Sequence, residues 1–453
     1  MIEASGGPRL RPALARTRVR ISEAITRAVL ACIALAVWIG RGVDLGVATL
    51  QLVDVTGLVL ILLAMAISGK AADRMRPRTP LVNSFLTLIL VAISLIIATG
   101  LLSALNAVDV GAVARFTLRY ILGLLLVASL VVLLDRPGRV RVLVKWLLLG
   151  AVLSVGISIL GLILPSVAEI TLRYGDRSQA LMNHPNQLAM LLTTVLPIAI
   201  AVAMGHGRRV NAWLVVLVIA GGIAMTGSKL NLGLLALGVL AYLLLVALTY
   251  PRLLVRLKAL LRVTAATVVL VGMAVAVMAY VTPRTINTVV RLLTEPAEVS
   301  AVVSRLELWQ TAFQLGWENP LVGIGAANAQ YFLPFHHAHN VFMEFLMTLG
   351  FTGLLALTLF LLVLAGLAST SVVRGVFNRA LSQYSRLMLI AVPFASALYV
   401  AANQSSDSFG GTTLPVLWLV VALNLAVLNH ARSMPDVGRR SQAKCNASAP
   451  QSE

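Results

Sequence analysis

Three of the six histidines in this sequence lie within one short segment, His336-His337-Ala338-His339-Asn340, which directly precedes an apolar run. If a helix begins near Asn340, His339 lies at its N-terminus, where unpaired N–H groups and the positive end of the helix dipole disfavour protonation of the ring. A neutral imidazole at neutral pH is what a general base requires. The alternative is that these histidines only line a helix start and are hydrated there. We expect chemistry at this segment, with His339 as the candidate catalytic residue and His337 and Asn340 as candidate substrate contacts.

The composition indicates which elements must position this segment. Of the 453 residues, 59% are hydrophobic and 12% are charged, and the mean hydropathy is +0.92. A soluble domain of this size needs more polar surface than this to face water. The apolar runs are about 17–25 residues long, which favours spanning helices over the short alternating strands of a barrel. The sequence therefore predicts an all-α integral membrane protein.

We place about twelve transmembrane helices from the lengths of the apolar runs. Their expected ranges are residues 22–40, 46–68, 80–102, 111–134, 143–164, 186–205, 212–227, 230–249, 264–281, 340–366, 387–404 and 412–430. The chain then divides into a basic N-terminus (1–21), spans one to nine (22–281), a long outer loop (282–339), spans ten to twelve (340–430) and a polar tail (431–453). The histidine segment stands at the end of the long loop.

Lysine and arginine set the expected orientation. With the N-terminus in the cytoplasm, most of the 36 basic residues fall in short loops on the cytoplasmic side, as the positive-inside rule requires. Both termini are then cytoplasmic, and the long loop faces outward. The net charge of +19 is explained by topology, so it gives no reason to expect a nucleic-acid partner. The two cysteines indicate neither a disulfide nor a metal site.

Some basic residues break this bias, because they lie at or near the predicted outer face. Arg115 and Arg119 are four residues apart, so they share one face of the fourth predicted span. They either snorkel to lipid headgroups or line a cavity. Lys229 stands in the tight hairpin Thr226-Gly227-Ser228-Lys229, too close to the bilayer to reach far into water. A charge at that depth needs a partner.

A second outer segment carries Arg173 and Arg177 and leads into Asn183-His184-Pro185-Asn186-Gln187-Leu188-Ala189. Asparagine and proline indicate a turn that feeds the sixth span, with Asn186 as its expected N-cap. His184 is either structural there or in contact with a substrate. Both arginines add to the positive charge expected on the outer face.

The long outer loop contains a predicted amphipathic helix. Ser304-Arg305-Leu306-Glu307 fits a capping box, which puts the helix start at Ser304 and Arg305 in the first turn. Apolar residues then recur at spacings of three and four, at Leu306, Trp309, Phe313 and Trp317. We expect this stripe to lie on the membrane interface or on the bundle, and Arg305 to face the mouth of the site. Asn319-Pro320 ends the helix, and Gly323-Ile324-Gly325 forms a tight turn.

The outer cations suit a ligand that is both anionic and lipid-anchored, because guanidinium groups match phosphate oxygens in bidentate geometry. A polyprenyl diphosphate sugar has both properties. Transfer of its sugar needs a base for an acceptor hydroxyl and positive charge for the departing diphosphate, but no cofactor. The outer carboxylates are scattered singly, which predicts a metal-independent reaction. The candidate ligand-binding residues are Arg115, Arg119, Arg173, Arg177, Lys229, Arg305, His337, Asn340 and His184.

Several motifs together resemble the O-antigen ligase and polymerase superfamily of bacterial envelope glycosyltransferases. They are Ser304-Arg305 with Trp309, then Asn319-Pro320-Leu321-Val322-Gly323-Ile324-Gly325, then His339-Asn340 with Glu344, Gly350 and Gly353. Weaker matches are Asn183–Ala189 and Thr226–Lys229, where many relatives carry Ser-Arg and this chain has Ser228-Lys229. The resemblance implies a twelve-span membrane glycosyltransferase fold of the GT-C-like type. It also implies that His339 activates the acceptor and that outer-face arginines hold undecaprenyl diphosphate.

Three functions are compatible with these features. The resemblance favours a ligase that moves a polysaccharide from undecaprenyl diphosphate onto lipid A-core or a similar acceptor. The second is a polymerase that joins lipid-linked repeat units with the same residues. The third is a transporter or flippase, although transporters tend to show paired broken helices and repeats, whereas this chain has one dominant outer loop. The expected location is the bacterial inner membrane, with the site facing the periplasm.

Overall fold

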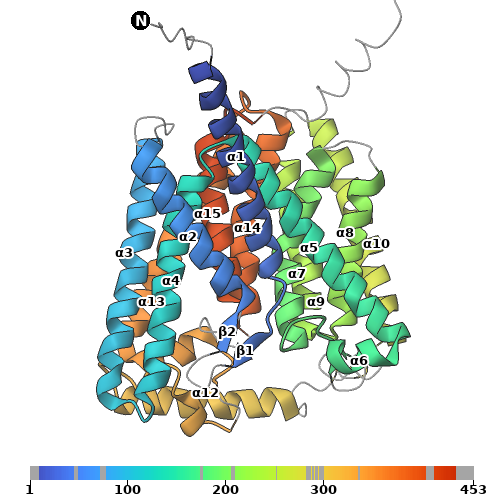
Figure 1. Ribbon diagram of the computed structural model, residues 1–453. Coiled ribbons are helices and arrows are strands. Elements are labelled where there is room, and N and C mark those ends of the chain that lie inside the picture. Colours follow the sequence, from blue (N-terminus) through green and yellow to red (C-terminus); the bar gives the residue numbers. More distant parts are fainter. Residues whose placement is uncertain are drawn as a thin grey trace, which may run out of the picture.

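The computed structural model shows a helical bundle whose two ends are built differently (Figure 1). It describes residues 10–44, 49–71, 78–173, 177–205, 210–250, 253–281, 287, 290, 294, 300–334, 337–404 and 413–434. Within these residues nearly all regular structure is α-helix, which confirms the expectation of an all-helical protein.

The helices follow one another along the chain with mostly short connections. Their bounds are α1 Leu10–Ala36, α2 Leu52–Ala71, α3 Pro80–Leu102, α4 Val110–Leu133, α5 Pro137–Ile163, α6 Pro165–Thr171, α7 Pro185–Gly205, α8 Val210–Met225, α9 Lys229–Ala247, α10 Leu253–Val281, α12 Ser300–Glu318, α13 Val341–Phe377, α14 Gln383–Ala402 and α15 Leu414–His430. Two short 3-10 helices are η2 Ser103–Asn106 and η4 Ala329–Tyr331. Two antiparallel hairpins pair β1 Gly42–Asp44 with β2 Thr49–Gln51, and β3 Leu172–Arg173 with β4 Arg177–Ser178.

Local sequence signals explain where several helices begin. Proline stands in the first turn of α3, α5, α7 and α15, where its missing N–H costs no hydrogen bond. Asp109 caps α4, because its carboxylate accepts from the N–H of Ala112 at 3.0 Å. Ser382 caps α14 in the same way, accepting from the N–H of Ser385 at 3.1 Å. These signals lie at the two ends of the bundle, where the chain turns.

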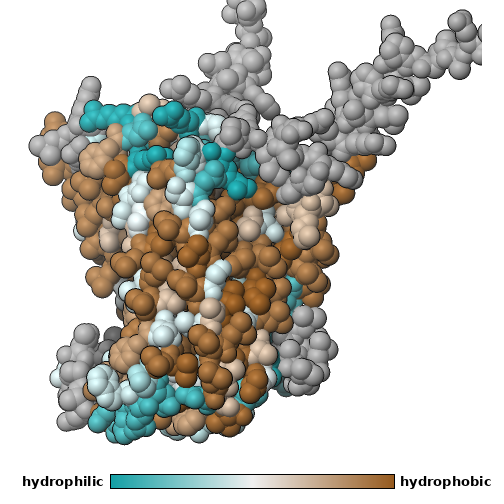
Figure 2. All heavy atoms as spheres, turned by 90° about the vertical axis from the view of Figure 1, so that its left-hand side faces the viewer, coloured by the Kyte–Doolittle hydropathy of each residue, from teal (hydrophilic) through white to brown (hydrophobic). Residues whose placement is uncertain are grey.

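Seven of the described helices are long and apolar enough to cross a membrane. They are α3 with η2, α4, α5, α7, α9, α13 and α14, and shorter apolar stretches lie in α2, α8, α10 and α15. Figure 2 shows hydrophilic residues at two opposite ends of the molecule and a broad hydrophobic band between them. The structure therefore indicates a multi-pass membrane protein. The number of twelve spans stays a prediction.

The two ends of the bundle differ in the segments that connect the helices. α1 begins at the upper end in Figure 1, whereas the β1–β2 hairpin, α6 and α12 lie at the lower end. α12 lies across this lower end rather than along the bundle. These are segments that the charge pattern assigned to the outer side, and they share one end of the molecule. The side of the membrane that this end faces stays a prediction.

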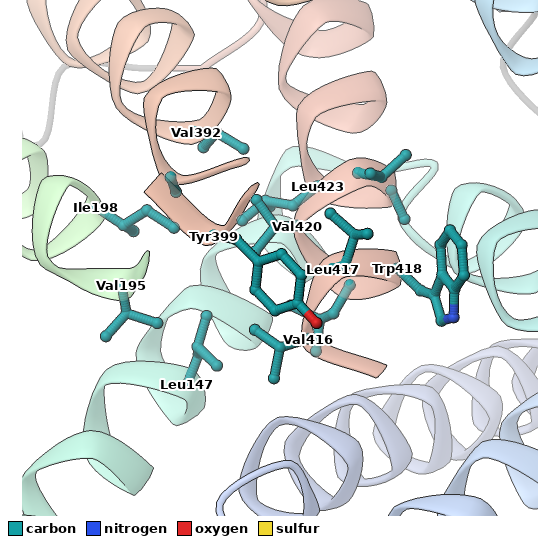
Figure 3. Close-up of a cluster of buried hydrophobic side chains, with 14 of the residues drawn as sticks. Leu147, Val195, Ile198, Val392, Tyr399, Val416, Leu417, Trp418, Val420 and Leu423 are labelled. Atoms are coloured by element: carbon teal, nitrogen blue, oxygen red, sulfur yellow. The ribbon is translucent and has the colours of Figure 1, made fainter. Parts of the chain in front are cut away.

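The centre of the bundle is formed by α7, α14 and α15. Most side chains of α7 and α15 are buried, and α14 packs along both helices. Figure 3 shows Tyr399 of α14 among valine and leucine side chains of α5, α7 and α15. Trp418 packs against the bare backbone of Gly123 in α4, where an added Cβ would lie 2.2 Å from the indole nitrogen. Chemistry is therefore expected at the ends of the bundle, where polar side chains gather (Figure 2).

Candidate active site

The first turn of α13 sets the position of the histidine segment. Asn340 is its N-cap, and Oδ1 of Asn340 accepts from the N–H groups of Phe342 at 2.9 Å and Met343 at 3.2 Å. This confirms the predicted helix start and gives Asn340 a structural role. His339 stands directly before the cap, close to the positive end of the helix dipole.

The backbone between the two described histidines is held on both sides. The N–H of Ala338 donates to Oε2 of Glu344 at 2.8 Å, and the indole N–H of Trp309 donates to the carbonyl of Ala338 at 3.0 Å. Glu344 is only 8% exposed and reaches back from the first turn of α13, while Trp309 belongs to α12. The histidine segment is thus tied to two helices at once.

The rings of His337 and His339 are in direct contact. Nε2 of His337 lies 3.1 Å from Nδ1 of His339, and the ring centroids are 4.0 Å apart. One nitrogen must donate and the other accept, so the contact favours at least one neutral imidazole. His339 has a φ of 51°, a left-handed conformation that costs a non-glycine residue about 1–3 kcal/mol. His336, the third histidine of the segment, lies outside the described residues.

The turn that follows α12 docks onto a break in α13. Gly350 has a φ of 70° and interrupts the helix. Three backbone hydrogen bonds join turn and helix, namely Ile324 N–H to Met347 C=O at 2.9 Å, Gly325 N–H to Thr348 C=O at 3.1 Å, and Phe351 N–H to Pro320 C=O at 2.7 Å. The segment Asn319–Gly325, which contains the predicted tight turn Gly323-Ile324-Gly325, therefore forms hydrogen bonds with backbone groups that the break releases from the helix.

Two glycines permit this close approach. A Cβ on Gly323 would lie 2.3 Å from the carbonyl carbon of Thr348, and a Cβ on Gly350 would lie 2.6 Å from the carbonyl oxygen of Pro320. Both residues also have a positive φ, which glycine adopts without strain. Gly323 and Gly350 belong to the motifs that suggested the family resemblance, and both are required for the packing that holds the start of α13 in place.

The Gly350→Ala variant should be less stable than the wild type. Alanine is strained at this positive φ, and its Cβ would collide with Pro320, so we expect a cost of at least about 1–3 kcal/mol. Thermal unfolding of the detergent-solubilised protein measures the change. Gly156→Ala in α5 is a matched control, because nothing lies within 4 Å of its Cβ position. Equal unfolding temperatures for the two variants would contradict this assignment.

α12 begins four residues earlier than predicted. It spans Ser300–Glu318, so Ser304 lies inside the helix and the capping box at Ser304–Glu307 is wrong as its start. Serine is tolerated there because its hydroxyl can be satisfied within a helix, and the residues before it continue the helix. Arg305 therefore stands in the second turn. The predicted end before Asn319-Pro320 is confirmed.

The apolar stripe predicted on α12 is divided between two sides of the helix. Trp309 packs against a small core made of Leu308, Ala312, Ile324, Ala329, Leu333, Ala338 and Met347. Leu306, Phe313 and Trp317 are instead 56%, 48% and 65% exposed. The rings of Phe313 and Trp317 stack with centroids 6.0 Å apart. The exposed side is available to the membrane interface, while the other side supports the histidine segment.

Three cations from distant parts of the chain gather at the same end. Arg177 of β4 donates from Nε to the carbonyl of Thr226 at 2.8 Å and from Nη2 to Oδ1 of Asn186 at 2.8 Å. Lys229 begins α9 directly after the turn that contains Thr226. The positive charges of Arg177 and Arg305 both act on the Lys229 ammonium. We refer to Arg177, Lys229 and Arg305 as the cationic cluster, because Arg177 is held by the turn directly before Lys229 and the charges of both arginines act on Lys229.

Arg305 connects the cationic cluster with the histidine segment. Arg305 and Trp309 are four residues apart, so they project from the same face of α12, and Trp309 is bonded to Ala338 between the histidines. Burial lowers the pKa of Arg305, but a guanidinium stays charged at neutral pH. In the described part of the chain, no carboxylate forms an ion pair with Arg305 or Lys229. Both side chains are therefore suited to receive an anion.

The other predicted cations are placed differently. Arg115 forms an ion pair with Asp109, the cap of α4, at 3.0 Å. Arg119 lines a small cavity between α2, α4 and α15, and Asp54 lines the same cavity. Each of these arginines thus has an acidic residue near it. The side chain of Arg173 lies outside the described residues.

His184 has a structural role at the start of α7. The helix begins at Pro185, and Nδ1 of His184 accepts from the N–H of Asn186 at 3.1 Å. The predicted N-cap at Asn186 is therefore wrong. Proline is favoured in the first helical position, so the helix already begins at Pro185, one residue before Asn186. The side chain of Asn186 holds Arg177 instead.

The sequence did not predict a role for Asn328. Its Oδ1 accepts from the N–H of Asp109 at 2.7 Å, and its Nδ2 donates to the carbonyl of Asp109 at 3.1 Å. Asn328 is fully buried, and it ties the loop after the docking turn to the start of α4. The only local signal was an asparagine close to a glycine turn, which does not reveal a distant partner.

Candidate metal ligands are not grouped in the residues that the structure describes. No three histidine, cysteine, aspartate or glutamate side chains there are arranged to hold a metal ion. Glu344, the acidic residue nearest to the histidines in the sequence, is bonded to the N–H of Ala338. The metal independence of the reaction stays a prediction.

Fold and site together define a multi-pass membrane protein with a histidine segment and a cationic cluster at one end of its bundle. Residues 214–358 match the family model of the O-antigen ligase domain. This match supports the O-antigen ligase superfamily and confirms the resemblance of the sequence motifs. The matched part includes Lys229, Arg305, His337 and His339. No curated protein matches the chain.

Proposed function

We propose that this protein is an O-antigen ligase that transfers a polysaccharide from undecaprenyl diphosphate onto lipid A-core or a similar acceptor. The observation that carries the proposal is the cationic cluster, in which Arg177, Lys229 and Arg305 come together from three segments at the end that holds His339. A diphosphate suits this cluster, because its oxygens can be bound by guanidinium and ammonium groups together. The family match also supports a lipid-linked glycan as the donor.

In this proposal the site faces the periplasm from a bacterial inner membrane, and both termini are cytoplasmic. The positive-inside pattern supports this orientation, and so does the gathering of the predicted outer segments at one end (Figure 1). The prenyl tail of the donor stays in the bilayer while its diphosphate reaches the cationic cluster. Such an arrangement fits a GT-C-like membrane glycosyltransferase with about twelve spans.

The proposed reaction is an attack of an acceptor hydroxyl on the anomeric carbon of the donor. His339 takes the hydroxyl proton as the new carbon–oxygen bond forms. The bond from the anomeric carbon to the diphosphate oxygen breaks, and its electron pair leaves on the diphosphate. Lys229 and Arg305 stabilise the charge that develops on this leaving group, so the reaction needs no metal ion. The products are the glycosylated acceptor and undecaprenyl diphosphate.

We assign His337 a positioning role. Its contact with Nδ1 of His339 sets the tautomer and the orientation of the catalytic ring. Glu344 and Trp309 hold Ala338 between the two rings, so they keep this contact in place. Loss of His337 should therefore slow the reaction less than loss of His339.

Reconstitution in liposomes tests the proposed function. Purified protein supplied with a lipid-linked glycan and lipid A-core should form a glycan–acceptor product without any nucleotide. Excess EDTA should leave the initial rate unchanged, because positive side chains take the place of a metal at the leaving group. The product is measured by its mass and by its shift on a gel.

Omission of lipid A-core separates the ligase from the alternatives. If lipid-linked chains lengthen without it, the protein is a polymerase. If the glycan lipid only changes leaflets and no glycosidic bond forms, the protein is a transporter. Loss of product in EDTA that a divalent cation restores would contradict the metal-independent mechanism.

A further inference from the structure

A cavity of about 510 Å³ lies at the end of the bundle opposite to the histidine segment. It is lined by residues of α5, α7 and α8 and by Tyr384 at the start of α14. Its position follows from the direction of α5, which runs from the cavity towards α6 at the lower end of Figure 1. Small-molecule sites in proteins typically have volumes of about 300–1,000 Å³, so the cavity is large enough for part of a lipid.

The cavity is charged at one end and apolar further in. Arg141, Lys145, Leu148 and Val152 follow one another on α5 at spacings of four, three and four, so they share one face of the helix. The two cations lie near the start of α5, and the two apolar residues lie one to two turns deeper in the bundle. Val202 of α7 lines the cavity as well. The charged end of the cavity therefore matches a lipid headgroup, and its apolar part matches an acyl chain.

Arg141 is not part of the ion network at this end. Its Nε is buried and has no hydrogen-bond partner among the described residues, and its charge acts on the hydroxyl of Tyr384. Arg139, two residues earlier, is in contrast held by Glu23 and Asp135, each at 2.7 Å. Arg141 also lines the cavity, and no described carboxylate forms an ion pair with it, so it is placed to bind an anion there.

The depth of the charged end agrees with that of phospholipid headgroups. Nζ of Lys145 lies 5.9 Å from the centroid of the Trp146 ring. Tryptophan is enriched where the headgroups lie, and lysine near a helix end extends to the same level. Leu148 and Val152 then lie at the depth of the acyl chains.

We propose that this cavity binds one anionic phospholipid. Its phosphate contacts Arg141, Lys145 and the hydroxyl of Tyr384, and one acyl chain lies along the apolar wall formed by α5, α7 and α8. The site is separate from the cationic cluster, which lies at the other end of the bundle. It therefore does not depend on the proposed ligase function.

Native mass spectrometry of the full-length protein tests this site. When phosphatidylglycerol and phosphatidylcholine are supplied in equal amounts in mild detergent, the protein should retain one molecule of phosphatidylglycerol in preference to phosphatidylcholine. The double variant Arg141→Ala/Lys145→Ala should retain it about tenfold less, since each basic residue near a membrane surface contributes several-fold. The control variant Lys258→Ala/Arg379→Ala removes the same charge from two exposed positions and should behave like the wild type.

A second variant tests the apolar part of the site. Val152→Trp leaves both cations in place but fills the cavity, so it should also lose the phospholipid. Phosphatidylglycerol should raise the unfolding temperature of the wild type and of the control, but not of Val152→Trp or the double variant. Equal retention of phosphatidylcholine, displacement by inorganic phosphate, preference for a polyprenyl phosphate, or undiminished binding by the double variant would each overturn the proposal.

Discussion

Replacing His339 by asparagine should reduce glycan transfer by about 10²–10⁴-fold, the contribution that is typical of a general base. Asparagine tolerates the left-handed backbone that His339 adopts, with a φ of 51°, so the local fold is kept. Its side-chain amide cannot take the proton of the acceptor hydroxyl. The measurement is the initial rate of glycan–acceptor formation in proteoliposomes at equal amounts of protein.

Two comparisons make this result specific for proton transfer. His337→Asn should lower the rate less, because His337 acts through its contact with His339. Both variants should bind the lipid-linked donor and unfold at temperatures close to those of the wild type. Wild-type transfer by His339→Asn would exclude His339 as the base. A loss of donor binding as large as the loss of rate would indicate a binding role instead.

Removing one charge from the cationic cluster should weaken donor binding strongly. We expect Arg305→Ala or Lys229→Ala to raise the Kd for the lipid-linked donor by about 10–100-fold, because a hydrogen bond to a charged group contributes about 1.5–3 kcal/mol. Transfer at saturating donor should also slow, since the same charges stabilise the leaving diphosphate. Binding of labelled donor to protein in nanodiscs measures the first effect, and the reconstituted assay measures the second.

The choice of variants separates charge from folding. Lys229→Arg keeps the charge and offers bidentate geometry, so it should bind the donor as well as the wild type or more tightly. Arg27→Ala is a matched control, because Arg27 lies at the other end of the bundle with its side chain 53% exposed. Arg177→Ala is less informative, since Arg177 also holds the carbonyl of Thr226. Unchanged donor binding in both alanine variants would limit the cluster to a structural role.

Local sequence was sufficient where a feature depends on neighbouring residues. The apolar runs predicted membrane-crossing helices, because a bilayer requires about 20 apolar residues. Asn340 was predicted to start a helix and Asn319-Pro320 to end one, since caps and prolines act within one turn. The capping box at Ser304 failed for a related reason, because the same four residue types are also tolerated inside a helix.

Contacts between distant segments could not be predicted in this way. Arg177 is held by Thr226, 49 residues away, and Asp109 is held by Asn328, 219 residues away. On charge and position alone, Arg115 was as good a candidate for the donor site as Arg177. The fold decides between them, since Arg115 pairs with Asp109 whereas Arg177 is held by the turn directly before Lys229.

The docking of the turn at Asn319–Gly325 onto α13 also sets an order for biogenesis. The carbonyl of Pro320 accepts a hydrogen bond from the N–H of Phe351, so the turn is synthesised before the part of α13 that binds it. Glu344, which holds Ala338 between the histidines, likewise leaves the ribosome after them. The segment with the proposed base can therefore reach its final form only once the first turns of α13 have been made. A nascent chain that stops before residue 351 carries every histidine of the segment but not a completed site.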